Sequence, residues 1–271
     1  MSPKRPLAKL ALAAATLLAI PALPAAPAAA ATIESTSSNW AGYAVARKGT
    51  RFRRVSGTWV QPAVTCTGDR AYSAYWVGLG GYRTTSQALE QIGTAADCDS
   101  TGTAHYTAWY ELVPAAAVTV KLNVRAGDTI AASVAVSAHR VRLHLVDRTT
   151  GAAVTRTVRA ATVDTTSAEW MAEAPSQCDE RGFCATQPLA DFGTASFTAA
   201  RATTTGGHAG AIRDPAWSAV AISLEDLPDG DPRFAGDMTS AGGATPGALS
   251  STGDAFSISF AGSSPAPGQV A

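Results

Sequence analysis

Short runs of alternating side chains, separated by glycine and proline turns, are the feature of this sequence that most restricts its fold. Successive side chains of a β-strand point to opposite faces, so each run divides into two faces by counting. Many such runs, with little helical periodicity after the first residues, predict an all-β antiparallel sandwich or barrel. Besides three runs within Ala71–Leu112, the predicted strands are Trp40–Val45, Val55–Val60, Val118–Val124, Thr129–Val136, Val141–Asp147, Val154–Val158, Ala195–Ala200, Trp217–Leu224 and Phe256–Phe260.

The three runs within Ala71–Leu112 combine core-like faces with aromatic and polar ones. The first run has Tyr75, Val77 and Leu79 on a face that we expect to join the core. Its other face carries one indole among small side chains, which lets another backbone come close: Ala74, Trp76, Gly78 and Gly80. The third run has His105, Thr107, Trp109 and Glu111 on one face and Tyr106, Ala108, Tyr110 and Leu112 on the other. The second run, Leu89–Gly93, is too short to decide whether Glu90 or Gln91 lies on the same face as Trp76 and Gly78.

The first 31 residues have the pattern of a secretory signal peptide. A basic start precedes a short apolar run, and small residues follow, with cleavage expected near Ala30 or Ala31. A membrane anchor is the alternative interpretation. Because the apolar run is short and is broken by Pro21 and Pro24, we expect a secreted, extracellular protein without a membrane association after signal removal.

The charge balance of the mature chain is slightly acidic. Removal of the signal takes away three basic residues and no acidic one, which leaves 18 basic residues (21 minus 3) against 21 acidic ones, a net charge of −3. This balance argues against nucleic acid or an anionic membrane as the main partner. We expect residues 32–262 to form a single, monomeric β-sandwich domain and residues 263–271 to form a disordered tail.

Four cysteines in an exported chain favour disulfides over free thiols. Three pairings are possible, and we favour Cys66–Cys98 with Cys178–Cys184 because each closes one local loop. A zinc site is the alternative, but the sequence contains no Cys-x-x-Cys pair and no His near the cysteines. We therefore expect no bound metal.

Basic residues alternate with apolar ones around Arg140–Arg148. One interpretation is a basic binding stripe that contains Arg140, Arg142, His144 and Arg148. The other is the solvated outer face of a sheet whose inner face is Val141, Leu143 and Leu145. We favour the solvated face.

Familiar nucleophile and cofactor motifs are missing. The sequence has no G-x-S-x-G turn, no H-E-x-x-H pair and no phosphate-binding Gly-Lys-Ser/Thr loop. We expect no cofactor, and the chemistry is left to carboxylates, amides and aromatic side chains.

Seven blocks, in order along most of the mature chain, resemble the glutamic endopeptidases (eqolisins). They are Ser38–Tyr43, Val55–Pro62, Trp76–Gly81, Leu89–Gly93, Ala108–Glu111, Ser167–Trp170 and Ala190–Gly193. The resemblance implies a concanavalin-like sandwich of two antiparallel sheets with a cleft on the concave face. It also implies a catalytic Gln91 and Glu169 and a substrate-lining Trp76.

We add Gly78, Trp109 and Glu111 to the predicted substrate-binding residues. The chain departs from the family pattern at Gly80 and Thr107, where members usually carry acidic residues, and near Val113, where an aromatic residue is common. No separate pro-segment is expected, because the first block follows soon after the predicted cleavage site.

Peptide hydrolysis without a nucleophilic side chain or a metal needs a base for water and a donor for the oxyanion. We expect Glu169 to take the proton from water and return it to the leaving amine. Gln91 would position the water and hold the oxyanion. In other enzymes, removal of such a donor raises the activation free energy by roughly 3–4 kcal/mol. An amide also stays uncharged, so Glu169 has no acidic partner with which to share a proton. Polypeptides are the expected substrates.

Two other functions fit the same residues. A sandwich with an aromatic-lined face can be a non-catalytic, lectin-like module that binds carbohydrate or peptide. Alternatively, Glu111 and Glu169 can form the acid and base of a glycoside hydrolase.

Overall fold

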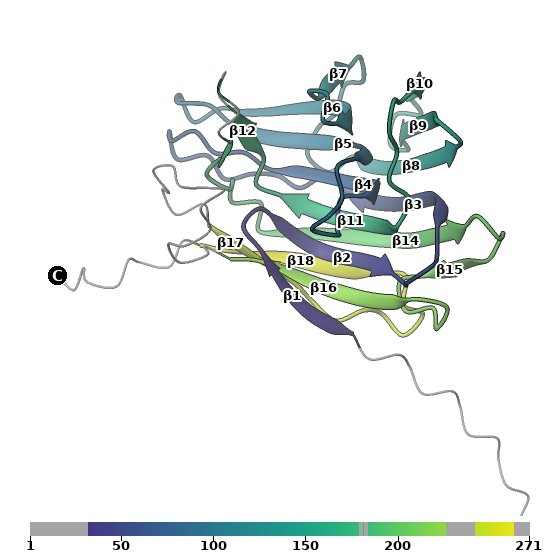
Figure 1. Ribbon diagram of the computed structural model, residues 1–271. Helices are drawn as coiled ribbons and strands as arrows, with labels where there is room; N and C mark the ends of the chain where they lie inside the picture. The colour runs from purple at the N-terminus through teal and green to yellow at the C-terminus, as the bar shows by residue number, and fades with distance from the viewer. Residues whose placement is uncertain (1–31, 179–180, 182–183, 226–241, 263–271) are drawn as a thin grey trace, which may run out of the picture.

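The computed structural model describes residues 32–178, 181, 184–225 and 242–262, and it contains only strands and loops in those residues (Figure 1). The predicted signal peptide and tail lie outside the described residues. The strands are β1 (Ile33–Ser37), β2 (Trp40–Ala46), β3 (Phe52–Val60), β4 (Ala74–Gly80), β5 (Leu89–Cys98), β6 (Ala104–Val113), β7 (Val118–Val120), β8 (Thr129–Ser137), β9 (Arg140–Asp147), β10 (Ala153–Arg159), β11 (Ser167–Glu173), β12 (Ser176–Cys178), β13 (Cys184–Thr186), β14 (Thr194–Thr204), β15 (Ala209–Ala211), β16 (Ser218–Leu224), β17 (Gly243–Pro246) and β18 (Phe256–Ala261).

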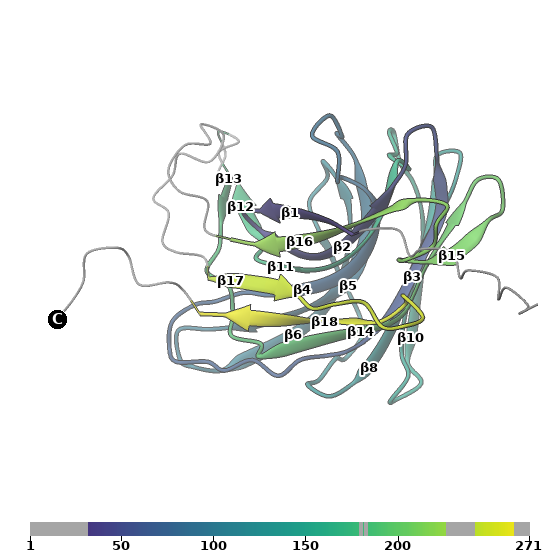
Figure 2. The ribbon, with the colours of Figure 1, turned by 90° about the horizontal axis from the view of Figure 1, so that it is seen from below.

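Two layers of strands pack face to face. The front layer has the order β16-β2-β11-β4-β5-β6-β7, and the back layer has the order β10-β9-β8-β3-β14-β18 (Figures 1 and 2). Indole hydrogen bonds join the layers: Trp170 Nε1 on β11 donates to the Ser56 carbonyl at 2.8 Å, and Trp59 Nε1 on β3 donates to Thr94 Oγ1 at 3.0 Å. The predicted all-β sandwich is confirmed.

The two layers form one hydrogen-bonded sheet rather than two separate ones. The short strand β17 pairs with β16 through Leu224↔Ala244 and with β18 through Ala244↔Phe260. The ladder therefore continues from one layer into the other at this side. All pairings along this path are antiparallel, whereas β1 pairs with β16 in parallel.

The core lies between the layers and is formed by the faces that the alternation predicted. Tyr75, Val77 and Leu79 are fully buried in the main apolar cluster, whereas Trp76 belongs to a second cluster on the outer face of the front layer. Gly57 shows how closely the layers approach, because a Cβ there would lie 2.8 Å from Trp170 Cδ1.

The predicted strands differ from the structure in several places, including the following two. The strand expected over Val118–Val124 ends at Val120. The sequence pattern also missed β11, in which six of the seven positions are buried, Ser167–Ala172, so that polar and apolar side chains do not mark two different faces.

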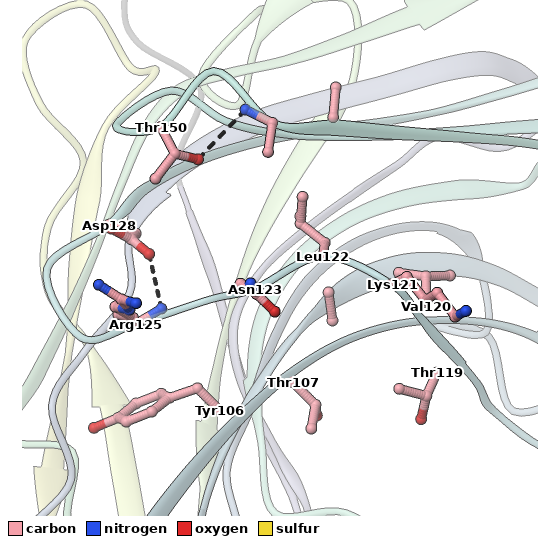
Figure 3. A pocket seen from close by; sticks show the side chains of 13 residues that line it. Tyr106, Thr107, Thr119, Val120, Lys121, Leu122, Asn123, Arg125, Asp128 and Thr150 are labelled. Carbon is pink, nitrogen blue, oxygen red and sulfur yellow. Dashed lines mark hydrogen bonds between the residues drawn. The ribbon is translucent and has the colours of Figure 1, made fainter.

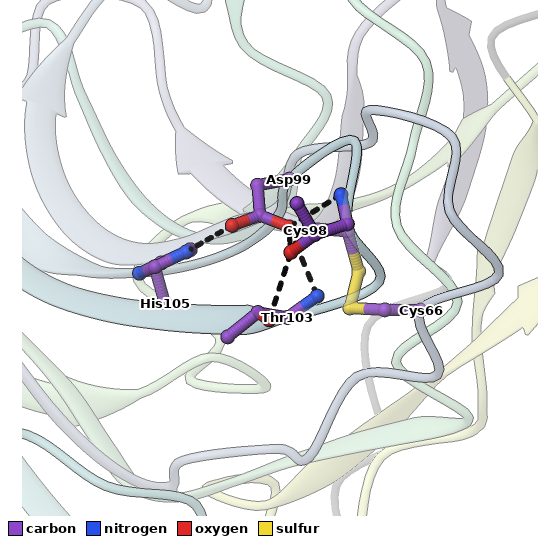
Figure 4. A network of polar contacts seen from close by, with 6 residues as sticks. Cys66, Cys98, Asp99, Thr103 and His105 are labelled. Carbon is purple, nitrogen blue, oxygen red and sulfur yellow. Dashed lines mark hydrogen bonds and ion pairs between the residues drawn. A yellow bond between two sulfur atoms is a disulfide. The ribbon is translucent and has the colours of Figure 1, made fainter.

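A disulfide joins Cys66 to Cys98, with Cα atoms 5.4 Å apart, as predicted. It ties the loop after β3 to the end of β5. Beside it, Asp99 accepts hydrogen bonds from the backbone of Thr103 and pairs with His105 Nε2 at 2.7 Å (Figure 4). For the second predicted disulfide, the backbones of Cys178 and Cys184 lie opposite one another in the β12–β13 pair. The side chain of Cys178 lies outside the described residues, so this pairing stays a prediction.

Candidate active site

One row of residues crosses four strands on the outer face of the front layer. Glu169 on β11 pairs with Gly78 on β4, Gly78 pairs with Gln91 on β5, and Gln91 pairs with Glu111 on β6. Directly opposed residues of antiparallel strands share a face, so these four positions lie side by side. Because neighbouring strands are about 4.8 Å apart, the Cα atoms of Glu169 and Gln91 are separated by roughly 10 Å.

The register also decides which residue of the Glu90–Gln91 pair belongs to the row. Gln91 lies with Gly78, and Glu90 lies with Leu79 and Leu112 on the core-facing side. The backbone N–H of Asp164 donates to Glu90 Oε1 at 3.3 Å. Burial raises the pKa of Glu90 to about 8.

Gly78 contributes no side chain between the carboxyl and the amide. A Cβ at this position would lie 2.9 Å from both Leu89 Cδ1 and Trp76 Cζ3, and 3.3 Å from Gln91 Cβ. Any other residue would therefore have to displace its neighbours. Glycine lets the side chains of Leu89 and Trp76 pack closely over the middle of the row.

The amide of Gln91 is held by Glu111. Gln91 Nε2 donates to Glu111 Oε2 at 2.6 Å, whereas Gln91 Oε1 is buried without a hydrogen-bond partner among the described residues. The amide nitrogen carries two hydrogens, so one remains for another acceptor. Burial raises the pKa of Glu111, and the hydrogen bond from Gln91 opposes that rise.

Glu169 is a buried acid without a partner. It has no exposed surface, and neither carboxyl oxygen has a hydrogen bond within the described part of the chain. Burial raises the pKa of Glu169 well above its ordinary value, the nearby hydroxyl of Ser167 opposes that rise, and the charges of Asp164 and Glu90 add to it. A buried, unpaired carboxyl costs stability, and such groups are enriched at functional sites.

Trp76 is fixed beside the row by a network that the sequence interpretation missed. Its Nε1 donates to Glu173 Oε2 at 2.7 Å, and Asn39 Nδ2 donates to Glu173 Oε1 at 3.1 Å. Trp40 contacts the same indole edge to face, with ring centroids 5.1 Å apart. Glu173 is two and four positions from Met171 and Glu169, so strand alternation puts it on their face once β11 is recognised.

Trp109, the second tryptophan among the predicted substrate-binding residues, lies close to Trp76. In the next row along the strands, Trp76 pairs with Gly93 and Gly93 pairs with Trp109. A Cβ on Gly93 would lie 2.6 Å from Trp76 Cβ, so this glycine makes room for the indole. Both tryptophans are buried in the outer cluster with Met171 and Leu89.

The structure explains one of the positions that depart from the family pattern, Gly80, and places the other two. Gly80 has φ +83°, and a Cβ there would lie 2.6 Å from Asp164 Cβ, so the loop at Asp164 occupies the space of a side chain. Thr107 lines a groove of about 700 Å³ between β6–β7 and the loops near Arg125 and Thr150 (Figure 3). That groove does not include Gln91 or Glu169. Val113 lies opposite Leu89, at the edge of the outer cluster.

Among the described residues, no group of three or more His, Cys, Asp or Glu side chains is arranged to hold a metal ion. In the same part of the chain, no helix has the length and apolar character needed to cross a membrane.

The sequence matches the Peptidase A4 family over residues 38–223. Aspergillopepsin-2 of Aspergillus niger is 30% identical over 203 residues, which are 66% of this chain and 69% of that protein. Scytalido-glutamic peptidase, solved with a transition state analog inhibitor, has a TM-score of 0.65 and 26% identity, covering 82% of this chain and 98% of its own. SCP-B, an eqolisin solved with the tripeptide Ala-Ile-His, has a TM-score of 0.62 and 25% identity over the same shares.

The fold and these relatives define a glutamic-type endopeptidase. The chain belongs to the Peptidase A4 family, since the match covers well over half of its length. The resemblance inferred from the seven sequence blocks is thereby confirmed. Family membership favours a peptidase over the lectin-like and glycosidase alternatives.

Proposed function

We propose that the protein is a secreted, acid-active endopeptidase in which Glu169 activates water and Gln91 stabilises the oxyanion. The observation that carries this proposal is the row Glu169–Gly78–Gln91, in which an acid and an amide lie on either side of a glycine on one face. In this proposal the attacking water is bound between the two side chains, next to the scissile carbonyl.

The reaction uses the acid twice. Ionised Glu169 takes a proton from water, and the water oxygen forms a bond to the carbonyl carbon. The carbonyl oxygen becomes an anion and accepts a hydrogen bond from Gln91 Nε2. The C–N bond then breaks, the nitrogen takes the proton from Glu169, and the products are a carboxylic acid and an amine.

Glu111 orients Gln91 for this role. With one amide hydrogen bound to Glu111, the second is free for the oxyanion, and the position of the nitrogen is fixed in advance. Preorganised donors of this kind need no rearrangement during the reaction. Trp76 and Trp109 would contact the substrate side chains next to the scissile bond.

Two relatives with bound ligands support a substrate-binding role for a protein of this fold. SCP-B was solved with a tripeptide, and scytalido-glutamic peptidase was solved with a transition state analog inhibitor. Secretion is proposed from the signal-peptide pattern of the first 31 residues.

The test is cleavage of an unfolded protein from pH 2 to 7 by the purified chain and by three variants. Glu169→Gln keeps the shape and removes the base, and Gln91→Ala removes the donor. Each should lower kcat/KM at least 100-fold while the circular dichroism spectrum stays unchanged. Glu34→Gln removes an exposed carboxylate of β1 and should leave the rate unchanged. Full activity of folded Glu169→Gln would refute the proposed mechanism.

A further inference from the structure

The acidic and basic residues of the strands are sorted onto different layers of the sandwich. The front layer with β1 contains no Lys or Arg in its strands, and its acidic residues are Glu34, Glu90, Asp97, Glu111, Glu169 and Glu173. The back layer carries seven arginines: Arg53, Arg54, Arg140, Arg142, Arg156, Arg159 and Arg201. Its strands contain one acidic residue, Asp147, which has no exposed surface. The near-neutral net charge of the chain conceals this segregation.

Five of these arginines share the outer face of the back layer. The register gives one row of Thr157, Arg142, Ala135 and Arg54, and a second row of Thr155, His144, Ser133, Ser56 and Arg201. In a third row Arg159 lies directly opposite Arg140. We call this surface, defined by Arg54, Arg140, Arg142, Arg159 and Arg201, the arginine face. All five side chains are exposed.

The arginine face lacks counter-charges. Within the described residues the ion pairs are His105–Asp99 and His208–Asp214, neither of which lies on this face. Arg140 and Arg159 oppose each other across neighbouring strands, a like-charge arrangement that destabilises a sheet. Apart from His144, whose Nδ1 is hydrogen-bonded to Thr155 Oγ1 at 2.8 Å, the residues between the arginines are small or hydroxyl-bearing, so the surface presents mainly hydrogen-bond donors and fixed positive charge.

We propose that the arginine face binds a linear sulfated polysaccharide. A guanidinium group matches the oxygens of a sulfate group in two parallel hydrogen bonds. Arg142 and Arg54 are two strands apart, roughly 10 Å between Cα atoms, which spaces the charges as a polymer requires. The hydroxyls of Ser56, Thr155 and Thr157 lie on the same face and can bind the hydroxyls of a sugar chain.

Three features disfavour the other polyanions. Single-stranded nucleic acids are held largely by bases stacked on aromatic rings, and the arginine face has no Trp, Tyr or Phe side chain. A sheet face without large apolar side chains between the cations has nothing to insert into a bilayer. Sulfate groups also keep their charge in acid, as arginine does, so the attraction persists where carboxylate polymers become neutral.

The arginine face and the Glu169–Gln91 row lie on opposite outer faces of the sandwich. A bound polymer would therefore leave the row accessible, and it would tether the protein without blocking it. Hydrolysis of a short peptide should be unaffected by the polymer. This expectation separates the arginine face from the proposed catalytic function, because binding can be measured in the inactive Glu169→Gln variant.

The experiment measures binding of the full chain to fluorescent dextran sulfate at pH 5 over a series of salt concentrations, with neutral dextran as reference. Arg140→Ser/Arg142→Ser, and separately Arg54→Ser/Arg201→Ser, should weaken binding at least tenfold and reduce the salt dependence. The matched control, Arg70→Ser, removes an exposed arginine from a loop and should change the affinity less than twofold.

Three results would overturn the proposal. If dextran sulfate bound no more tightly than neutral dextran, the proposed site would be ruled out. Equal affinity of the arginine-face variants and Arg70→Ser would place binding elsewhere. Tighter binding to a single-stranded oligonucleotide, to polyphosphate or to vesicles of anionic lipid would assign the face to another class of partner. Two independent double variants keep the test valid if one of them fails to fold.

Discussion

Gln91 and Glu169 flank Gly78 in a single cross-strand row, although 77 positions (169 minus 91, minus one) separate them in the sequence. The row joins three strands, and the central one contributes no side chain at this point. The distance between the acid and the amide is thus set by the spacing of the sheet. Changes to the glycine should therefore alter catalysis without touching either functional group.

Gly78→Ala should lower kcat/KM more than tenfold, because its Cβ would lie 2.9 Å from Trp76 Cζ3 and 3.3 Å from Gln91 Cβ and would displace the side chains of the row. Overpacking of this kind also costs about 1–3 kcal/mol of stability. The matched control is Gly57→Ala, whose Cβ would lie 2.8 Å from Trp170 Cδ1 inside the core. It should lose similar stability and keep the activity of its folded fraction. Equal activity losses in both variants, measured below their melting temperatures, would show that Gly78 has no special role in the geometry of the row.

Glu111→Ala should lower kcat roughly 5- to 150-fold with little change in KM, because loss of an acceptor leaves the buried amide of Gln91 unpaired at a cost of about 1–3 kcal/mol. Glu111→Gln retains an acceptor oxygen and should recover most of the rate. Steady-state kinetics on one peptide measures both. If Glu111→Gln were as inactive as Glu169→Gln, Glu111 would be a second acid or base rather than a positioning residue.

The pH dependence of kcat/KM should report the ionisation of Glu169. The base must be ionised, and burial raises the pKa of Glu169 above the ordinary value of 4.5. Activity should therefore rise with pH along an acid limb centred above pH 4.5. Initial rates across the pH range at substrate concentrations far below KM give this limb. A limb centred below pH 4 would contradict an unpaired, desolvated Glu169 as the base.

Stability should fall as the pH rises from about 5 to 8. Burial raises the pKa of Glu90 to about 8 and that of Glu173 to about 7, so the folded state binds more protons than the unfolded state between those values and 4.5. The contribution of Glu90 alone is on the order of 3–5 kcal/mol. Glu90→Gln cannot ionise and should show a flatter dependence in urea unfolding at pH 5 and pH 8. Parallel curves for the two proteins would exclude Glu90 as the cause.

The sequence predicted local features well. Period-two alternation assigned Tyr75 and Val77 to the core and Trp76 to the opposite face, because facing depends only on neighbouring residues. The partner of each strand is a long-range property and was not predictable in this way. Strand β11 has buried side chains on both faces, so it gave no alternation signal, and Glu169 was identified by resemblance alone.

The network around Glu173 was missed for the same reason. Its two donors come from β4 and from the residue before β2, and only the pairing of β11 with both strands brings them together. Likewise, the arginines of the back layer are scattered over four strands in the sequence. Net charge is a sum over the chain, so it cannot reveal that positive and negative side chains are sorted onto different layers.

The continuity of the sheet through β17 makes the two sides of the sandwich unequal. On that side, backbone hydrogen bonds hold the layers together, and separation would require breaking a ladder. On the other side the path ends at the edge strands β7 and β10, and within the described residues no strand pairing joins the layers there. We therefore expect thermal separation of the two layers to begin at the β7 and β10 edges, beside the groove of Figure 3, rather than at β17.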